Sequence, residues 1–293
     1  MSDAVSRLRS FHRTVTQRIG ALSDGYLGRG RPLAESRLLF EIGAEGAQIR
    51  DLRARLGLDS GFLSRLLRSL ESQSLVKTTI SKIDGRVRIA SLTRAGRAEL
   101  VQLNDLSDEL AQSILEPLSG NQRQRLIAAA GEVEKLLQAS AVILSVESPD
   151  HRDAGWCMEQ YFQELNVRFS GGFDPRSSIS AEPDELKPPH GYFVVARLFA
   201  HPVGCGALKL TGGGVGEIKR MWVSPQARGL GVARRVLNEL ERLARSARLE
   251  ILRLETNKSL QEAQALYRSN SYVEVEPFNT EPYAHHWFEK RLA

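Results

Sequence analysis

The sequence predicts a two-domain α+β protein, in which a mostly helical N-terminal domain precedes a C-terminal domain built on a mixed α/β sheet. The length of 293 residues fits about two domains. Apolar residues recur at spacings of three and four through most of the first half, which is typical of amphipathic helices. Segments typical of strands alternate with helical ones after residue 190. Because the short polar segment 147–153 contains Pro149, we expect domains at residues 1–146 and 150–293.

Composition narrows the classes of protein to consider. Hydrophobic residues make up 42% and charged residues 26% of the chain, which is ordinary for a globular protein. The longest apolar stretch, residues 139–146, is far shorter than the roughly 20 residues that a membrane span needs, and the N-terminus lacks the apolar core of a secretory signal. The two cysteines, Cys157 and Cys205, are too few for a disulfide framework or a four-cysteine zinc site. We expect a cytoplasmic protein without a metal site or a membrane partner.

Four helices are expected early in the chain, at residues 3–22, 33–42, 47–56 and 61–73. Gly57 is placed to end the third helix, and Asp59 or Ser60 can cap the fourth. Two short helices joined by Gly-Leu-Asp-Ser have the spacing of a helix-turn-helix, whose second helix enters the major groove of DNA. The candidates for contact with bases or phosphates are therefore Ser60, Ser64, Arg65 and Arg68.

A β-hairpin is expected next, with strands at residues 75–81 and 87–92 around the turn signal Asp84-Gly85. The side chains at its tip that can hold phosphates or enter a minor groove are Lys82, Arg86 and Arg88. Between residues 50 and 97 the chain has eleven Lys and Arg against four Asp and Glu. Such a basic stretch indicates a polyanion site, although charge alone is equally compatible with a solvated surface.

The N-terminal half resembles the MarR family of winged helix-turn-helix repressors over about residues 4–144. The resemblance rests on residues 49–76 and on a wing pattern formed by Asp84, Arg86, Leu92, Thr93 and Gly96. It implies double-stranded operator DNA as a partner and a homodimer formed through the N-terminal domain, for which the helical stretches 97–115 and 121–144 offer apolar faces. Gln73-Ser74 stand where the family usually has a glycine before Leu-Val. The alternative is a winged helix used only for protein contacts.

In the second half we expect a helix at residues 156–169 and a loop at residues 171–189. Strands are expected at 192–199, 204–211, 216–223, 250–255, 272–275 and 286–292, and further helices at 231–247 and 260–269. Early strands joined by tight turns, followed by a β-α-β-α-β run, predict a mixed α/β sheet with helices on both faces.

One segment of this half carries a specific chemical signal. The strand at 216–223 runs into a loop with Gly229 and Gly231, and the loop opens a helix. Glycines let the backbone approach a ligand closely, and the N–H groups of a first helical turn bind anions. The segment is not a nucleotide P-loop, because no Gly-Lys-Ser/Thr follows, and the third glycine of the dinucleotide fingerprint is missing. The sequence therefore predicts another kind of anion site, with a plain tight turn as the alternative.

This half resembles the GNAT family of acetyl-CoA-dependent N-acetyltransferases over about residues 155–293. The matching motifs are the loop 226–231, the strand before it, Leu254-Glu-Thr-Asn257 and Ala265-Leu-Tyr267, whereas Ser271 replaces the usual glycine before the next aromatic residue. The resemblance implies acetyl-CoA as the cofactor, with its pyrophosphate on the loop. The residues expected to bind it are Met221, Trp222, Val223, Gln226, Arg228, Gly229, Leu230, Gly231, Val232, Ala233, Asn257 and Arg268.

Acetyl transfer from a thioester to an amine needs a neutral amine, a polarised carbonyl and a proton for the leaving thiolate. Backbone N–H groups of residues 221–223 can hold the thioester oxygen. Tyr267 resembles the tyrosine that protonates the leaving sulfur, with a core tyrosine as the alternative. Glu217 precedes Met221 by four residues on one strand, so we expect both on the same side. Glu217 is therefore our candidate base, and a surface or substrate-orienting carboxylate is the alternative.

The acceptor pocket has the candidates Asn279, Tyr283 and His285, with Arg168 and Phe173 as weaker ones and packing as the alternative. The two resemblances imply a bifunctional protein: a transcriptional regulator that is also an N-acetyltransferase acting on a small amine or amino-acid-like acceptor. One alternative is a DNA-binding regulator whose C-terminal domain senses acetyl-CoA or another ligand without catalysis. Another is binding of RNA or protein by the basic half.

Overall fold

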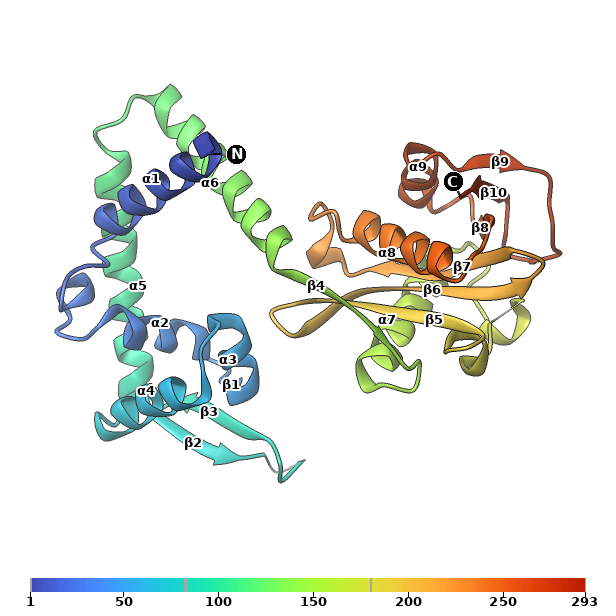
Figure 1. The fold of residues 1–293 in the computed structure, drawn as a ribbon. Coiled ribbons are helices and arrows are strands. Elements are labelled where there is room, and N and C mark those ends of the chain that lie inside the picture. Colours follow the sequence, from blue (N-terminus) through green and yellow to red (C-terminus); the bar gives the residue numbers. More distant parts are fainter. Residues whose placement is uncertain (1, 82–83, 180, 293) are drawn as a thin grey trace. The chain divides into compact units, whose positions relative to one another are not determined.

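The computed structural model describes residues 2–81, 84–179 and 181–292, and Figure 1 shows its fold. The chain forms two compact units, the first ending at Gly131 and the second beginning at Glu132, so the division falls within helix α6 (Gly120–Ala141). Each unit has its own apolar core. Across the described ranges, no helix has both the length and the apolar character that crossing a bilayer requires.

The N-terminal unit is mostly helical and carries a small antiparallel sheet in the order β1-β3-β2. Its helices are α1 (Ser2–Arg18), α2 (Leu33–Ile42), α3 (Ile49–Leu56), α4 (Ser60–Ser72) and α5 (Arg94–Leu115), with a 3-10 turn at Tyr26–Gly28. Its strands are β1 (Ala47–Gln48), β2 (Val76–Ile80) and β3 (Arg88–Leu92). The core is filled by leucines of α2, α3 and α4, namely Leu38, Leu39, Leu52, Leu63, Leu66, Leu67 and Leu70. The predicted helix-turn-helix and hairpin are present.

Individual residues account for the turns of this unit. Gly57 adopts the left-handed conformation, with φ 62° and ψ 30°, and ends α3. The Asp59 carboxylate accepts a hydrogen bond from the Phe62 N–H at 2.9 Å and caps α4. Ser74 has a positive φ of 58° in the turn before Leu-Val, where the MarR resemblance leads one to expect a glycine. The turn therefore keeps a left-handed residue, although a serine is more strained there than a glycine.

The C-terminal unit is a seven-stranded sheet in the order β4-β5-β6-β7-β8-β10-β9 (Figure 1). Its β7 and β8 are parallel, and the other neighbouring strands are antiparallel. The strands are β4 (Val142–Glu147), β5 (Gly191–Leu198), β6 (His201–Gly212), β7 (Val215–Val223), β8 (Ile251–Thr256), β9 (Val273–Val275) and β10 (His286–Arg291). The helices are α7 (Arg152–Arg168), α8 (Val232–Ser246) and α9 (Gln261–Ser269), with 3-10 turns at Pro175–Ser177, Pro183–Leu186 and Pro225–Ala227.

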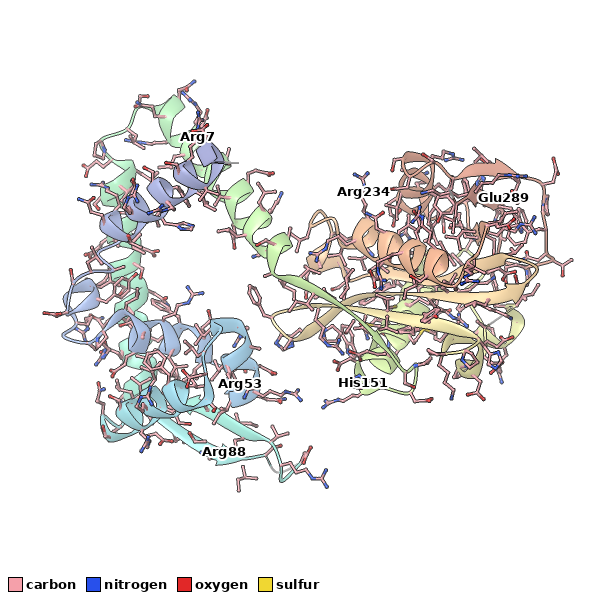
Figure 2. The ribbon with its side chains drawn as sticks, in the orientation of Figure 1. Arg7, Arg53, Arg88, His151, Arg234 and Glu289 are labelled. Carbon is pink, nitrogen blue, oxygen red and sulfur yellow. The ribbon has the colours of Figure 1, made fainter. Side chains whose placement is uncertain are left out.

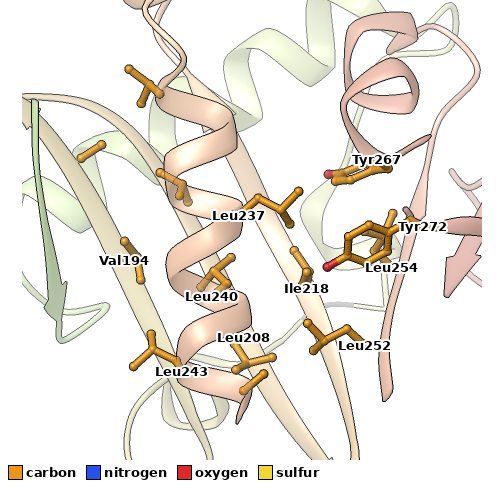
Figure 3. Close-up of a cluster of buried hydrophobic side chains, with 14 of the residues drawn as sticks. Val194, Leu208, Ile218, Leu237, Leu240, Leu243, Leu252, Leu254, Tyr267 and Tyr272 are labelled. Carbon is orange, nitrogen blue, oxygen red and sulfur yellow. The ribbon is translucent and has the colours of Figure 1, made fainter. Parts of the chain in front are cut away.

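Two apolar layers cover the two faces of this sheet, which confirms the predicted mixed sheet with helices on both faces. One layer joins α8 to the sheet and includes Val194, Leu208, Ile218, Leu237 and Leu240 (Figure 3). The other layer joins α7 to the sheet and includes Ala154, Cys157, Phe193, Val195, Cys205 and Trp222. The neighbours Phe193 and Val194 fall in different layers, as the alternation of side chains along a strand requires.

Strand β4 lies where the sequence predicts the end of a helix and a domain boundary. It pairs with β5 from Val142 opposite Leu198 to Glu147 opposite Phe193, so the sheet begins before residue 146. Arg197 holds this edge, because its guanidinium donates to the Asp153 carboxylate at 2.9 Å and pairs with Glu147.

The polar segment after β4 is therefore a loop inside the second unit, and the structure divides the chain between residues 131 and 132 rather than at residues 146–150. The sequence pattern is ambiguous here, because a short apolar run such as residues 139–146 suits a helix end as well as a strand.

Candidate functional site

The glycine loop connects β7 to α8. Gly229 and Gly231 have φ of 83° and 72°, a region in which residues with a Cβ are strained. A Cβ at either position would meet no atom within 4 Å, so the backbone conformation rather than crowding calls for glycine. The first N–H groups of a helix lack intrahelical acceptors and carry a partial positive charge. The start of α8 therefore offers an anion site beside open space.

A cavity of about 500 Å³, here called the larger cavity, opens on this loop. Eight of the residues expected to bind the cofactor line it: Met221, Trp222, Val223, Arg228, Gly229, Gly231, Val232 and Ala233. The other four lie elsewhere. Leu230 is buried and Gln226 is exposed, Arg268 pairs with Glu274 at 2.9 Å, and Asn257 donates to the Tyr283 carbonyl at 2.7 Å.

A second cavity of about 90 Å³, here called the smaller cavity, shares walls with the larger one. The residues that line both are Tyr161, Leu165, Met221, Leu260, Ala263 and Tyr267. Aromatic rings of Phe169, Phe173 and Tyr283 form part of the remaining wall of the smaller cavity, and its charged lining residues are Lys219, Arg220, Glu255 and Glu281. A group held in one cavity can thus reach a group held in the other.

A β-bulge interrupts β7 beside both cavities. The register against β6 shifts between Cys205 and Ala207, and Arg220 on β7 has a positive φ of 58°. A bulge inserts one extra residue into a strand and reverses the alternation of side chains beyond it. As a result, Ile218 packs in the α8 layer, whereas Trp222 packs in the α7 layer.

The bulge corrects the prediction that Glu217 and Met221 face the same side of the sheet. Four residues apart on a regular strand they would do so, but the extra residue at Arg220 puts them on opposite faces. Met221 lines both cavities, and Glu217 lines neither of them. Glu217 instead pairs with Lys219 at 3.0 Å.

Tyr267 lies between the two cavities, where a side chain that protonates a leaving sulfur would be expected. It belongs to α9, and its side chain is almost fully buried beside the apolar cluster of Figure 3. It lines both cavities. Burial raises the pKa of Tyr267 well above its usual value, so its hydroxyl keeps its proton at neutral pH. The prediction that Tyr267 protonates a leaving group stays a prediction.

Lys219 and Glu255 form a buried ion pair in the wall of the smaller cavity, each with only 9% of its side chain exposed. Although burial opposes the charged ammonium, the carboxylates of Glu255 and Glu217 raise the pKa of Lys219. Burial raises the pKa of Glu255, against the opposing effect of Lys219. The pair therefore combines a firmly protonated lysine with a carboxylate that binds a proton more readily than usual.

The mouth of the smaller cavity is held together by a second carboxylate. Glu281 accepts hydrogen bonds from the Ile179 N–H at 2.6 Å and from the Ser178 hydroxyl at 2.9 Å. The Tyr283 hydroxyl accepts one from the Asp174 N–H at 3.0 Å. These contacts tie the predicted loop between α7 and β5 to the segment that precedes β10.

The N-terminal unit places the predicted DNA-contacting residues on exposed surfaces. Ser60, Ser64, Arg65 and Arg68 lie on the exposed face of α4, opposite the leucines that enter the core. Arg86 is exposed in the turn of the hairpin, and Arg88 is exposed at the first residue of β3, next to that turn (Figure 2). Lys82 lies outside the described residues. Exposed basic side chains on one helix and one hairpin are what a phosphate-binding surface requires.

Comparison with known proteins identifies both halves of the chain. Residues 158–272 match the acetyltransferase (GNAT) family, and residues 29–87 match the MarR family. An IAA acetyltransferase of Azospirillum brasilense is 40% identical over 120 residues, which cover 41% of this chain and 78% of that protein. The chain belongs to the GNAT family. Its GNAT domain follows a MarR-type domain, as both resemblances predict.

Further relatives match one domain each. An uncharacterized N-acetyltransferase of Schizosaccharomyces pombe is 30% identical over 144 residues, covering 48% of this chain and 87% of that protein. A GNAT-family acetyltransferase structure from Staphylococcus aureus has a TM-score of 0.45 and 16% identity, covering 52% of this chain and 100% of that one. A mutant form of Escherichia coli MarR in complex with operator DNA has a TM-score of 0.39 and 23% identity, covering 45% of this chain and 95% of that one.

Within the GNAT domain, an ion-pair network forms part of the wall of the larger cavity. Arg228, expected to bind phosphate, donates to both oxygens of Glu164 at 2.6 and 2.7 Å. Glu164 also accepts from the Trp222 indole N–H at 2.9 Å and from Arg168 at 3.1 Å. Arg168 further bridges to Glu262, which raises the pKa of Arg168. Arg168 thus belongs to the larger cavity of the GNAT domain rather than to an acceptor pocket.

Only some of the residues predicted to bind the acceptor line the smaller cavity of the GNAT domain. Tyr283 and Phe173 line the smaller cavity, whereas Asn279 lies behind its wall and donates to Glu255 at 3.4 Å. His285 is exposed, and its ring contacts the Tyr283 carbonyl at 3.3 Å.

Sequence analysis missed several polar side chains of the smaller cavity, among them Tyr161, Lys219, Arg220, Glu255 and Glu281. One signal was available, because Glu255 lies inside the motif Leu254-Glu-Thr-Asn257. Charged residues alternating along a strand, however, also suit a solvated face.

Proposed function

We propose that the protein combines two activities: its GNAT domain transfers an acetyl group from acetyl-CoA to a small amine or amino-acid-like acceptor, and its MarR-type domain binds double-stranded operator DNA. The observation that supports acetyl transfer most directly is that Met221 and Tyr267 line both cavities. A thioester in the larger cavity and an amine in the smaller one would meet between these two residues. We propose an amine as the acceptor because direct transfer to an amine needs a carboxylate that can take up a proton. It needs no thiol or hydroxyl nucleophile of the chain.

The larger cavity suits coenzyme A in its shape and chemistry. The open space above Gly229 and Gly231 and the start of α8 would take the pyrophosphate. Bound acetyl-CoA supplies an activated acetyl group. Backbone N–H groups released by the bulge near Met221 would hold the thioester oxygen, and the Tyr267 hydroxyl would give its proton to the leaving sulfur.

DNA binding and a homodimer are proposed for the N-terminal unit. Exposed Ser64, Arg65 and Arg68 on α4 support base and phosphate contacts, and Arg86 and Arg88 support contacts from the wing. Exposed apolar side chains on α1 and α6 support self-association, among them Leu8, Phe11, Leu126 and Ile127.

Release of free thiol from acetyl-CoA in the presence of tyramine, putrescine or phenylalanine tests the enzymatic half of the proposal. We expect release with at least one amine, and none from the Gly229→Asp variant, whose carboxylate would lie in the space proposed for the pyrophosphate. The variant must still unfold cooperatively. Absence of thiol release by the native chain with an extended amine panel would refute acetyl transfer.

A second candidate function is supported by a contact of Arg235. This residue lies in the first turns of α8, and its guanidinium donates to the carbonyls of Ala139 at 2.8 Å and Val142 at 2.7 Å. The proposed coenzyme site is thereby connected to the end of α6. The GNAT domain would then sense a ligand and tune DNA binding, with or without catalysis.

A further inference from the structure

We propose that Glu255 is the catalytic residue that takes the proton from the acceptor's ammonium group, and that Lys219 and Asn279 are positioning residues that aim its carboxylate. This inference rests on the proposed acetyl transfer and assigns its base. Glu255 lines the smaller cavity together with Met221 and Tyr267, which also border the larger cavity. Glu217, expected as the base from the sequence, shares its face of the sheet with Lys219 and Glu255 but lines neither cavity.

Both oxygens of the Glu255 carboxylate are held from neighbouring elements. Lys219 of β7 donates to Oε1, and the Asn279 amide donates to Oε2 at 3.4 Å. Asn279 is itself oriented, because its Oδ1 accepts from the Trp287 indole N–H of β10 at 2.8 Å. A carboxylate with one donor on each oxygen keeps a lone pair on each for an incoming ammonium.

The charges around Glu255 suit a proton acceptor. Lys219 stays protonated between Glu255 and Glu217, while Tyr161 and Tyr267 face the same carboxylate as neutral hydroxyls, since burial raises the pKa of Tyr161 to about 12 and that of Tyr267 further. Glu281 adds a second carboxylate to the cavity wall, and Arg220 of β7 adds a guanidinium. Burial also raises the pKa of Glu255, which brings the base closer to the working pH of an amine transfer.

The protons balance in this scheme. The acceptor's ammonium gives one proton to the Glu255 carboxylate, and the neutral nitrogen attacks the acetyl carbonyl carbon. As the C–N bond forms and the C–S bond breaks, the sulfur takes the Tyr267 hydroxyl proton. The surplus N–H proton then returns to the Tyr267 oxygen, and Glu255 releases its proton to solvent. Each turnover yields an amide, a thiol and one free proton.

The smaller cavity also limits the class of acceptor. Phe169, Phe173 and Tyr283 supply an aromatic wall beside the carboxylates, and the volume is only about 90 Å³. Such a wall suits a small primary amine with an apolar or aromatic body, whose ammonium would interact with both the rings and the carboxylates.

The test is the dependence of kcat/KM on pH, measured with the amine that the native chain acetylates fastest in the panel above. A base acts only when deprotonated, so the native rate should rise with pH through the raised pKa of Glu255. Glu255→Gln should lower kcat by roughly 10²–10⁴-fold and remove this acid limb. Coenzyme A binding, measured by calorimetry, should persist.

Glu217→Gln is the matched control, because it removes a carboxylate from the same ion-pair cluster. The acid limb should remain and move to lower pH, since Glu217 raises the pKa of Glu255. Lys219→Met should move the limb to higher pH, because Lys219 lowers that pKa, and Lys219→Arg should restore much of the native profile. A merely structural role for Lys219 would lower activity without moving the limb.

Two results would overturn the proposal. One is a native-like limb and kcat in Glu255→Gln, and the other is loss of the limb in Glu217→Gln. If Glu255→Gln fails to fold or to bind coenzyme A, the direction of the shift in Lys219→Met decides. Failure of the native chain to acetylate any amine would instead refute the proposed function itself.

Discussion

Glu164 is a residue whose charge opposes the binding of coenzyme A at the proposed site. Its carboxylate engages Arg228 through both oxygens and also accepts from Trp222 and Arg168. A carboxylate in the wall of a cavity that takes an anionic ligand opposes binding in two ways: it neutralises Arg228, and it repels the phosphates.

We therefore predict that Glu164→Gln tightens coenzyme A binding, by about 5-fold for the loss of one partly screened like charge. Glutamine keeps an oxygen for the Trp222 N–H. Calorimetric titration measures the effect, and Glu159→Gln, an exposed residue on the same helix, should leave affinity unchanged. Weaker binding by Glu164→Gln would mean that the carboxylate supports the cavity rather than competing for it.

At the scale of elements, the first turn of α5 shows how one missing side chain permits a close contact. Thr93 caps this helix by accepting a hydrogen bond from the Gly96 N–H at 3.0 Å. A Cβ on Gly96 would lie 1.9 Å from the Leu75 carbonyl oxygen. The glycine of the wing pattern is therefore required by the approach of two backbones.

Gly96→Ala should destabilise the protein by about 3 kcal/mol, because the backbone of Leu75 or of α5 must shift. Gly131→Ala is the opposite case, since it is exposed in α6 and its Cβ would meet nothing within 4 Å. It should stabilise by roughly 0.5–1 kcal/mol through the lower entropy of the unfolded chain. Denaturant unfolding of both variants checks the prediction, and a Gly96→Ala variant as stable as the native chain would contradict it.

The wing is the element that most directly tests DNA binding. Arg86 is exposed, and its backbone N–H is fixed by the Asp84 carboxylate at 2.9 Å. Arg86→Ala should weaken binding to all duplex sequences and lower the slope of log affinity against log salt by about 1. Acetyl transfer should be unchanged.

Arg242→Ala supplies the control, because Arg242 is exposed on α8 and pairs with Glu239 at 2.7 Å. Fluorescence anisotropy at several salt concentrations measures both variants. An equal salt slope in native and Arg86→Ala proteins would remove the wing from the DNA contacts.

At the scale of the whole molecule, one chain segment can couple the two proposed activities. The contacts of Arg235 with Ala139 and Val142 connect α8 to the end of α6, and α6 continues into the N-terminal unit. A ligand changes DNA affinity only if it binds two states of the chain with different affinity.

We predict that coenzyme A shifts the affinity for a duplex selected from a random library by about 5-fold or more. Arg235→Met should abolish this shift while leaving coenzyme A binding intact. Gel-shift titrations with and without coenzyme A measure the effect. Equal affinities in the native chain would exclude the sensing function and leave two independent activities.

Local patterns in the sequence were sufficient for the helices, the hairpin and the two families. Gly57, Asp59 and Asp84-Gly85 stand at the turns that were expected, because capping and turn preferences depend on nearest neighbours. The glycine loop before α8 was predicted for the same reason, because its conformation depends on consecutive residues of the sequence.

The site itself depends on how distant strands are paired, which no local pattern encodes. A single extra residue at Arg220 reverses the face of β7 beyond it, so Met221 no longer shares a face with Glu217. Glu255 and Lys219 meet because β7 and β8 are neighbours in the sheet, and Asn279 joins them from the segment between β9 and β10. The sequence alone thus determined the elements and the kind of chemistry. The tertiary structure decided which carboxylates line the smaller cavity, because strand register is a long-range property.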